Sequence, residues 1–354
     1  MRIQLEKFLN NSRRNFIKSA GLGSMGLILA SQMGRSGDQN FHSFAGEAKS
    51  SLHAVGNTPL IKLNTFSEAK SAEIWVKWEG ANPTGSMKDR MALGIIESAE
   101  KKGLLKPGMR IIELTGGSTG SSLAMVAAPK GYKTHFVTSD AVSLEKRLTM
   151  EALGATLELI PSHGQGITPE LVQRSLEKVR ELAHEPDTFW VNQFSNPDNA
   201  AGYRILGQEI LNAGMPDAFV MGVGTGGCIT GVSDVLKDEK NGNTPLIVAV
   251  EPAASRSLSG GPTGGHQLEG IGLGFIPETL RMDLIDEIEA VSDDEAFEVA
   301  RSLARKEGLF AGPTSGANVA VAQRIAKKLG PGKRVVTLLC DTGLRYLSTD
   351  LYGS

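Results

Sequence analysis

A turn followed by a helix is encoded by the stretch Asn82-Pro83-Thr84-Gly85-Ser86-Met87-Lys88-Asp89-Arg90. Proline fixes φ and glycine tolerates positive φ, so Asn82-Pro83 and Thr84-Gly85 favour a turn. Ser86 is a predicted N-cap, because its hydroxyl can accept hydrogen bonds from the first free N–H groups of a helix. Apolar residues at helical spacing then continue the helix to a stop at 101–103.

Lys88 lies in the first turn of this predicted helix, at the positive end of the helix dipole. That position disfavours an ammonium and favours a neutral amine. A lysine whose pKa falls below its ordinary value of about 10.4 can form a Schiff base with a carbonyl. Position alone does not separate this role from that of a solvated surface lysine, so the case for Lys88 depends on the rest of the chain.

Length and composition indicate a globular chain with more than one domain. The 354 residues suffice for two domains of roughly 150 residues each. Hydrophobic and charged fractions of 40% and 21% are typical of a protein with a buried core. A formal net charge of -2 gives no reason to expect nucleic acid or an anionic membrane as partner. The histidines show no metal-ligand spacing, and two cysteines do not make a disulfide framework.

The first 45 residues are predicted to be a twin-arginine-type signal segment. Arg13 and Arg14 precede a modest apolar run, 20–30, which is shorter than the about 20 residues that a spanning helix needs. Small residues at Ser43 and Ala45 permit cleavage after Ala45. We therefore expect export to a periplasmic or other extracytoplasmic location, without stable membrane insertion. A basic tail that is not a functional signal would leave the protein in the cytoplasm.

Predicted strands alternate with helices along the rest of the chain. The strands cover residues 73–79, 109–114, 134–138, 156–160, 188–191, 218–223, 246–250 and 334–339. This alternation predicts an α/β fold with two doubly wound domains and mainly parallel sheets, over 51–195 and 196–354. Ligands bind beyond the carboxyl ends of the strands in such folds.

Three loops of small residues are expected at those ligand-binding ends: 115–120, 224–228 and 312–316. Converging N–H groups and a helix N-terminus at 224–227 suit a phosphate. However, 222–227 also satisfies G-x-G-x-x-G and Glu251 ends the next strand, so this loop alone does not exclude a dinucleotide. The loop at 115–120 suits a carboxylate. In the third loop, Thr314 and Ser315 supply hydroxyls that either bind a ligand or cap the following helix.

The lysine stretch and seven other segments occur in the order found in one enzyme family. These segments are residues 56–60, 115–120, 192–194, 224–228, 266–277, 312–317 and 341–349. From about residue 51 to its end, the chain resembles the cysteine synthase / cystathionine β-synthase family. Those proteins are pyridoxal-phosphate enzymes with the tryptophan synthase β-like fold (fold type II). The resemblance implies pyridoxal 5'-phosphate as cofactor and a homodimer.

The resemblance also implies a role for each loop. Lys88 forms the Schiff base with the cofactor and later moves the α-proton of the substrate. Thr314 faces the pyridine nitrogen, where a neutral hydroxyl leaves the ring a moderate electron sink and favours loss of a β-substituent. The cofactor phosphate is bound by Gly224, Thr225, Gly226, Gly227 and Cys228. The substrate carboxylate is bound by Thr115, Gly116, Gly117, Thr119 and Gln193.

Three positions depart from the usual family pattern. Ser118 stands where the family usually has Asn, whose amide reaches the phenolic oxygen of the cofactor. Serine is shorter and offers a single donor, so this cofactor contact and the substrate preference are open. Cys228 replaces a usual Thr and keeps only the backbone N–H, whereas Thr314 replaces a usual Ser and keeps the hydroxyl.

The expected activity is β-replacement on an O-activated serine, or on serine, by a small nucleophile such as sulfide. Its product is cysteine or a close analogue. A β-eliminating lyase that deaminates serine or desulfhydrates cysteine remains open, because Ser118 alters the loop that would distinguish the two. Two further classes are a non-catalytic binder with this fold and an NAD-linked dehydrogenase that uses 222–227. The dehydrogenase leaves Lys88 and Thr314 without a role.

Overall fold

The computed structural model describes residues 50–164, 168–238, 240, 242 and 244–353. The predicted signal segment, 1–45, lies outside the described residues. Residues 48–354 cluster as one compact unit. Within the described residues, no helix is long and apolar enough to cross a membrane.

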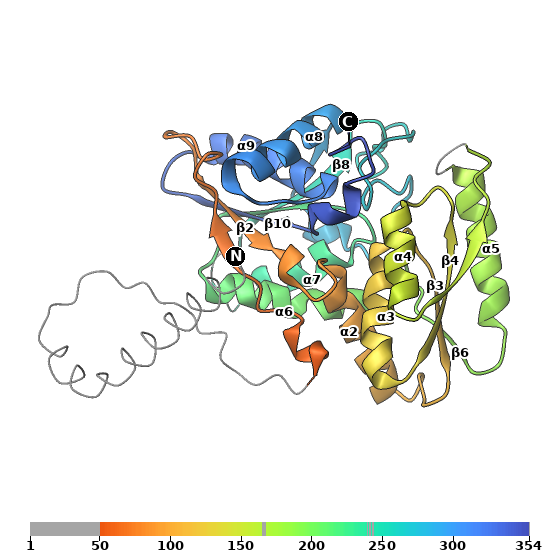
Figure 1. Cartoon of the computed structure of the whole chain (residues 1–354). Coiled ribbons are helices and arrows are strands. Elements are labelled where there is room, and N and C mark those ends of the chain that lie inside the picture. The colour runs from red at the N-terminus through yellow and green to blue at the C-terminus, as the bar shows by residue number, and fades with distance from the viewer. Residues whose placement is uncertain (1–49, 165–167, 239, 241, 243, 354) are drawn as a thin grey trace, which may run out of the picture. The chain divides into compact units, whose positions relative to one another are not determined.

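The described chain forms two β-sheets with helices on both faces (Figure 1). The six-stranded sheet contains, in spatial order, β1 (Leu60–Lys62), β2 (Glu73–Trp78), β10 (Arg334–Leu339), β7 (Ala218–Gly222), β8 (Leu246–Pro252) and β9 (Glu287–Val291). The four-stranded sheet contains β5 (Thr156–Ile160), β4 (Lys133–Ser139), β3 (Arg110–Leu114) and β6 (Thr188–Trp190). Apart from β1–β2, the described neighbours pair in parallel. The predicted α/β fold with mainly parallel sheets is confirmed.

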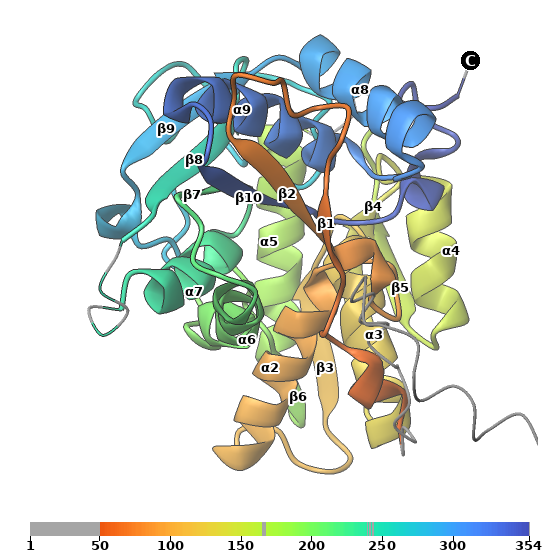
Figure 2. The same cartoon turned by 90° about the vertical axis from the view of Figure 1, so that its left-hand side faces the viewer.

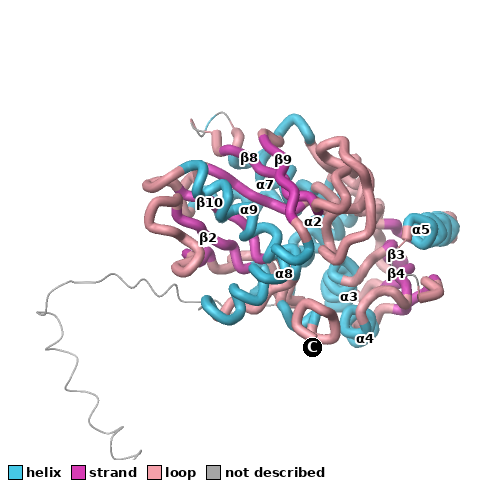
Figure 3. Tube along the Cα trace, turned by 90° about the horizontal axis from the view of Figure 1, so that it is seen from above, coloured by secondary structure: helices cyan, strands magenta, loops and turns pink. Residues whose placement is uncertain are grey.

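Helices cover both faces of each sheet (Figures 2 and 3). On the six-stranded sheet, one face carries α6 (Asp198–Asn212) and α7 (Gly227–Leu236), and the other carries α8 (Asp293–Ser302) and α9 (Pro313–Leu329). On the four-stranded sheet, one face carries α3 (Ser118–Lys130) and α4 (Leu144–Ala152), and the other carries α5 (Pro169–Ala183). Helix α2 (Lys88–Lys101) packs against both α3 and α6. The helix that begins at the predicted catalytic lysine is therefore held between the two sheets.

The two observed sheets do not follow the predicted domains 51–195 and 196–354. A strand of the first predicted domain lies in the sheet built mainly by the second. Strand β2 pairs in parallel with β10, with Ile74 opposite Val335 and Val76 opposite Thr337. The buried side chains of Ile74 and Val76 belong to the core beneath α8 and α9. Residues 60–78 are therefore part of the sheet of the second half. Apolar alternation identified β2 as a strand, but it carries no information about the partner strand.

Two of the three hydrophobic clusters flank the six-stranded sheet. One joins Ile95 of α2 to Leu206 of α6 and Phe219 of β7. The other lies under α8 and α9 and includes Val335 and Ile325. The sequence analysis missed β9, whose residues are mostly half-buried and follow a charged-apolar alternation at the edge of the sheet. An edge strand with charged residues resembles a surface loop in composition.

Candidate active site

The turn before Lys88 is docked onto the carboxyl end of β10. Met87 N–H donates to the Cys340 carbonyl at 2.8 Å, and Thr342 N–H donates to the Gly85 carbonyl at 2.9 Å. Gly85 has a φ of 75°, and a Cβ there would lie 2.7 Å from the Thr342 side chain. Glycine is needed for this close approach of the two loops. The strand end and the lysine turn therefore form one unit.

The predicted cap of α2 is close to its observed start. Met87 occupies the N-cap position and caps no N–H with its side chain. Ser86 Oγ accepts the N–H of Lys88 at 3.2 Å, so its hydroxyl satisfies one of the free donors of the first turn. Lys88 lies in the first turn, as the sequence predicted, and the helix begins one residue later than an N-cap at Ser86 would give.

The amine of Lys88 is surrounded by protein, although the residue keeps some exposed surface. Burial lowers the pKa of Lys88, while the nearby Cys228, Cys340 and Asp341 oppose that shift. Within the described residues, no hydrogen bond or ion pair uses its Nζ. A lysine with a lowered pKa and no competing partner can act as an amine nucleophile. Desolvation thus adds to the helix-dipole effect that the sequence predicted.

The glycine loop after β7 leaves donors free at the start of α7. The N–H groups of Thr225, Gly226 and Gly227 have no hydrogen-bond acceptor among the described residues. A Cβ at Gly224 would lie 2.1 Å from the Gly270 carbonyl oxygen, and Gly226 has a φ of 81°. Side chains are therefore excluded from a loop whose backbone donors meet a helix N-terminus. This arrangement fits a phosphate.

Asn199, at the start of α6, supports this loop and was not identified from the sequence. Its Nδ2 donates to Thr225 Oγ1 at 3.1 Å and to the Gln193 carbonyl at 2.7 Å. A Cβ at Gly227 would lie 2.0 Å from Asn199 Oδ1. Asn199 therefore joins the predicted phosphate loop to Gln193 of the predicted carboxylate site. An Asn that follows a turn carries no sequence signal for such a distant contact.

The loop after β3 is shaped by its own first hydroxyl. Thr115 Oγ1 accepts the N–H groups of Gly117 and Gly120, each at 3.0 Å. A Cβ at Gly116 would meet nothing within 4 Å, so there is space beside that residue. Thr115 thus organises the backbone of the loop, and the free side of the loop lies at Gly116.

Gln193 is fixed beside this loop from three directions. Thr119 Oγ1 donates to Gln193 Oε1 at 2.8 Å, and Gln193 Nε2 donates to the Leu114 carbonyl at 2.9 Å. Glu113 Oε2 accepts the Gln193 N–H at 3.1 Å, and Glu113 Oε1 accepts the Leu114 N–H at 2.8 Å. Burial raises the pKa of Glu113 to about 8. Thr119 and Gln193 are adjacent, as predicted, and Glu113 is a supporting residue that the sequence analysis missed.

Thr314 lies near the glycine loop. Its Oγ1 donates to the Glu269 carbonyl at 2.8 Å, and a Cβ at Gly222 would lie 3.3 Å from its methyl group. The next residue, Gly270, is the one that packs against Gly224. With its proton directed to Glu269, the hydroxyl of Thr314 is left as an acceptor for a ligand. Its predicted position near the same ligand as the phosphate loop is consistent with these contacts.

Charged residues that the sequence analysis did not identify surround Ser118. Ser118 Oγ accepts from Arg345 Nη1 at 3.3 Å. The ammonium of Lys146 pairs with the carboxylate of Glu269, and its aliphatic chain lies where a Cβ on Gly117 would be. These residues come from distant parts of the chain. Among the described residues, no group of His, Cys, Asp or Glu is placed to hold a metal ion.

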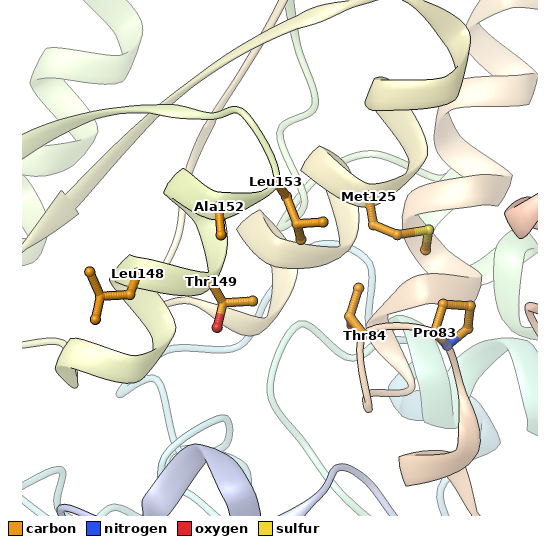
Figure 4. A pocket seen from close by; sticks show the side chains of 7 residues that line it. All are labelled: Pro83, Thr84, Met125, Leu148, Thr149, Ala152 and Leu153. Atoms are coloured by element: carbon orange, nitrogen blue, oxygen red, sulfur yellow. The ribbon is translucent and has the colours of Figure 1, made fainter.

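A pocket of about 450 Å³ lies between α3, α4 and the turn before Lys88 (Figure 4). Its lining is mostly apolar and consists of Pro83, Thr84, Met125, Leu148, Thr149, Ala152 and Leu153. None of the predicted site residues lines it. The pocket therefore neighbours the predicted site without being part of it.

The contacts of Glu251 test the alternative that residues 222–227 bind a dinucleotide. In a dinucleotide site, an acid at this place reaches the ribose hydroxyls. Here Glu251 Oε2 accepts the Leu258 N–H at 2.8 Å, and Oε1 accepts from Ser259 Oγ at 2.5 Å. Both oxygens of this buried carboxyl are used within the following loop, which argues against a nicotinamide cofactor.

Comparison with known proteins identifies the family. Residues 52–341 match the family described as "Pyridoxal-phosphate dependent enzyme". A cysteine synthase from Staphylococcus aureus is 45% identical over 303 residues, covering 84% of this chain and 95% of that protein. The structure of a cysteine synthase from Entamoeba histolytica is 34% identical, with a TM-score of 0.81 and coverage of 91% of this chain and 94% of that chain.

A hydrogen sulfide-producing enzyme from Fusobacterium nucleatum is 39% identical, with a TM-score of 0.79. That comparison covers 86% of this chain and 99% of the other. The free backbone donors of the glycine loop and the unpaired amine of Lys88 fit an aldehyde cofactor that carries a phosphate. The chain therefore belongs to the pyridoxal-phosphate dependent enzymes, as its resemblance to the cysteine synthase / cystathionine β-synthase family predicted.

Proposed function

We propose that this enzyme replaces the β-substituent of an O-activated serine, or of serine, to give cysteine or a close analogue. The observation that carries the proposal is the amine of Lys88, which has a lowered pKa, no partner among the described residues and Cys228 of the glycine loop as a neighbour. Relatives named cysteine synthase support the same reaction class. Sulfide is the proposed small nucleophile.

Pyridoxal phosphate, when bound, supplies an aldehyde that can condense with amines and an electron sink for the bond-breaking steps. Thr225, Gly226, Gly227 and Cys228 would hold its phosphate through their N–H groups. Thr314 would lie at the ring nitrogen. Its hydroxyl, which donates to the Glu269 carbonyl, is neutral and does not place a negative charge there.

Lys88 would take the proton from the substrate α-carbon and return it. An amine whose pKa is lowered by burial is neutral at a lower pH than an exposed lysine, which suits this role. The substrate carboxylate would be oriented by the N–H groups around Gly116 and by Gln193. The carboxamide of Gln193 is held by Thr119 and Leu114, so it is oriented before substrate binds.

A second candidate is β-elimination from cysteine or serine. The similarity to a hydrogen sulfide-producing enzyme favours it, as does the replacement of the usual Asn by Ser118. The two reactions share every residue role proposed here and differ in whether a second nucleophile is accepted.

One assay separates these functions. The purified enzyme is incubated with O-acetylserine, with and without sulfide, and cysteine and pyruvate are quantified. We expect cysteine in the presence of sulfide, and no product from Lys88→Ala. Pyruvate as the main product under both conditions would favour elimination. Borohydride reduction followed by mass spectrometry should locate the cofactor on Lys88, and a label elsewhere would refute the proposal.

The proposal includes a homodimer, which sedimentation velocity of the purified enzyme tests. It also includes export directed by residues 1–45, a segment outside the described structure. A sedimenting species with the mass of a single chain would contradict the dimer.

A further inference from the structure

Arg345 is a buried cation, and no carboxylate of the described residues contacts it. It lies in the 3-10 turn Gly343–Tyr346 and is 6% exposed. Its Nη2 donates to the Thr84 carbonyl at 2.6 Å and to Thr84 Oγ1 at 3.2 Å, while Nη1 donates to Ser118 Oγ at 3.3 Å. Nε is buried and has no partner among the described residues. The direct acceptors of this buried guanidinium are neutral, although Thr84 Oγ1 also donates to Asp89, so its charge is only indirectly compensated and can support an anion at its Ser118 side.

The nearest carboxylates, Asp89 and Asp341, do not contact Arg345 directly among the described residues, and Asp341 Oδ1 has no partner there. Asp89 accepts the N–H and the hydroxyl of Thr84, at 2.7 and 2.6 Å. Asp341 accepts from the hydroxyl of Tyr346 at 2.8 Å. The charges of Asp89 and Asp341 interact with Arg345 at longer range, but neither forms an ion pair with it among the described residues. Within the part of the chain that the structure describes, the guanidinium thus lacks a contacting counter-ion.

The contact with Ser118 directs this cation toward a ligand. Ser118 is the first residue of α3, a helix whose N-cap, Gly117, provides no side-chain cap. Since Ser118 Oγ accepts from Arg345, its own proton remains available, and no acceptor for it is found among the described residues. A hydroxyl polarised by a guanidinium is a stronger donor than an isolated hydroxyl. The helix N-terminus adds positive potential at the same place.

We propose that Arg345 and Ser118 form a relay that binds an anionic oxygen at the start of α3. Arg345 donates to Ser118, and Ser118 donates to the anion. This inference rests on the proposed function, because the anion is either the phenolic oxygen of the cofactor or the carboxylate of the amino-acid substrate. Arg345 is a positioning residue, because it acts through Ser118.

The test compares Arg345→Gln, Arg345→Lys and Ser118→Ala with the wild-type holoenzyme. Arg324→Gln is the matched control, since Arg324 is a partly buried arginine that pairs with Glu289 and Glu295 on the outer face. The probes are L-alanine, which lacks a β leaving group, and L-alaninol, which also lacks the carboxylate. Binding is followed through the cofactor absorbance, and thermal stability is measured in parallel.

If the anion is the substrate carboxylate, Arg345→Gln should raise the Kd of L-alanine by about tenfold to hundredfold and leave that of L-alaninol unchanged. If the anion is the phenolic oxygen, the absorption spectrum of the free holoenzyme and its pH dependence should change instead. In both cases Ser118→Ala should reproduce the effect of Arg345→Gln, and combining the two substitutions should add little to either one. Arg345→Lys should keep part of the binding that Arg345→Gln loses.

The relay is overturned if Arg345→Gln loses only thermal stability, as Arg324→Gln does, with unchanged spectra and Kd values. It is also overturned if the effects of Arg345→Gln and Ser118→Ala are fully additive. Failure of the proposed function is a different result: the wild-type enzyme would then form neither cysteine nor pyruvate, whatever the binding data show.

Discussion

Arg90 Nε lies 2.7 Å from Glu79 Oε2, and both side chains are buried. The same guanidinium pairs through Nη1 with Glu209 Oε1 of α6, also at 2.7 Å. Arg90 lies two residues after Lys88 in α2, so these pairs tie the first turn of α2 to the end of β2 and to α6. The position of the proposed catalytic amine therefore depends on a buried ionic cluster.

Glu79→Gln should destabilise the protein strongly. Removing one partner of a buried ion pair leaves a charge incompletely compensated, which costs about 3 kcal/mol or more of unfolding free energy. The control is Glu68→Gln, because the Glu68–Lys327 pair is exposed on both sides and should contribute less than about 1 kcal/mol. Urea unfolding of the two variants measures the difference. Equal midpoints would show that the cluster does not hold α2.

Glu113 should make stability depend on pH. Burial raises its pKa from 4.5 to about 8. The folded state therefore binds the Glu113 proton more tightly than the unfolded state. This contribution is fully present below the unfolded pKa and is lost as the pH rises through the folded pKa.

We expect the unfolding free energy of the wild type to fall, relative to Glu113→Gln, by about 1.4 kcal/mol per pH unit at most within this window. Urea unfolding at several pH values between about 5 and 8 tests this, with the wild-type minus variant difference as the readout. A difference that is constant across the window would contradict a buried, protonated Glu113.

Lys88 should be acylated more readily than exposed lysines of the cofactor-free protein at mildly acidic pH. Burial lowers its pKa, so a larger fraction is neutral there than for an exposed lysine. Mass spectrometry after brief treatment with an amine-directed reagent, at several pH values, would compare Lys88 with Lys101 of the same helix. If Lys101 reacts at a lower pH than Lys88, the proposed state of the amine is wrong.

Gly227→Ala should weaken cofactor binding. The added Cβ would lie 2.0 Å from Asn199 Oδ1, so either the loop or Asn199 must move. We expect the Kd of pyridoxal phosphate to rise by about tenfold or more, equivalent to at least about 1.4 kcal/mol. At Gly265 a Cβ would meet nothing within 4 Å, so Gly265→Ala is the control.

Adding Asn199→Ala to Gly227→Ala removes the clashing oxygen and should recover part of the affinity. Equilibrium dialysis measures all three variants. An affinity of Gly227→Ala equal to that of Gly265→Ala would show that the glycine loop tolerates a side chain and does not grip the phosphate.

Replacing Arg13 and Arg14 by lysine should retain the enzyme in the cytoplasm, because a twin-arginine signal is read through its paired arginines. Cell fractionation followed by immunoblotting measures the outcome. Cells that express residues 46–354 alone are fractionated in the same way and show where a chain without residues 1–45 is found. Continued export of the lysine variant would refute the signal.

Much of the candidate site could be predicted because its residues are encoded in short, continuous segments. The lysine turn, the loop at 115–120 and the glycine loop each bring their own glycines, hydroxyls and helix start, and these features are local. Glu113, Asn199 and Arg345 could not be found in that way. Each is a single polar residue whose role depends on a partner that the fold brings to it.

The sequence by itself determined most of the strands and helices, the three ligand loops and the place of Lys88 in the first turn of α2. It could do so because backbone preference and apolar periodicity act over a few residues. Only the tertiary structure decided that β2 joins β10, that burial lowers the pKa of Lys88, and that Arg345 reaches Ser118, 227 residues away. These facts depend on which surfaces are desolvated together, and no local pattern records that.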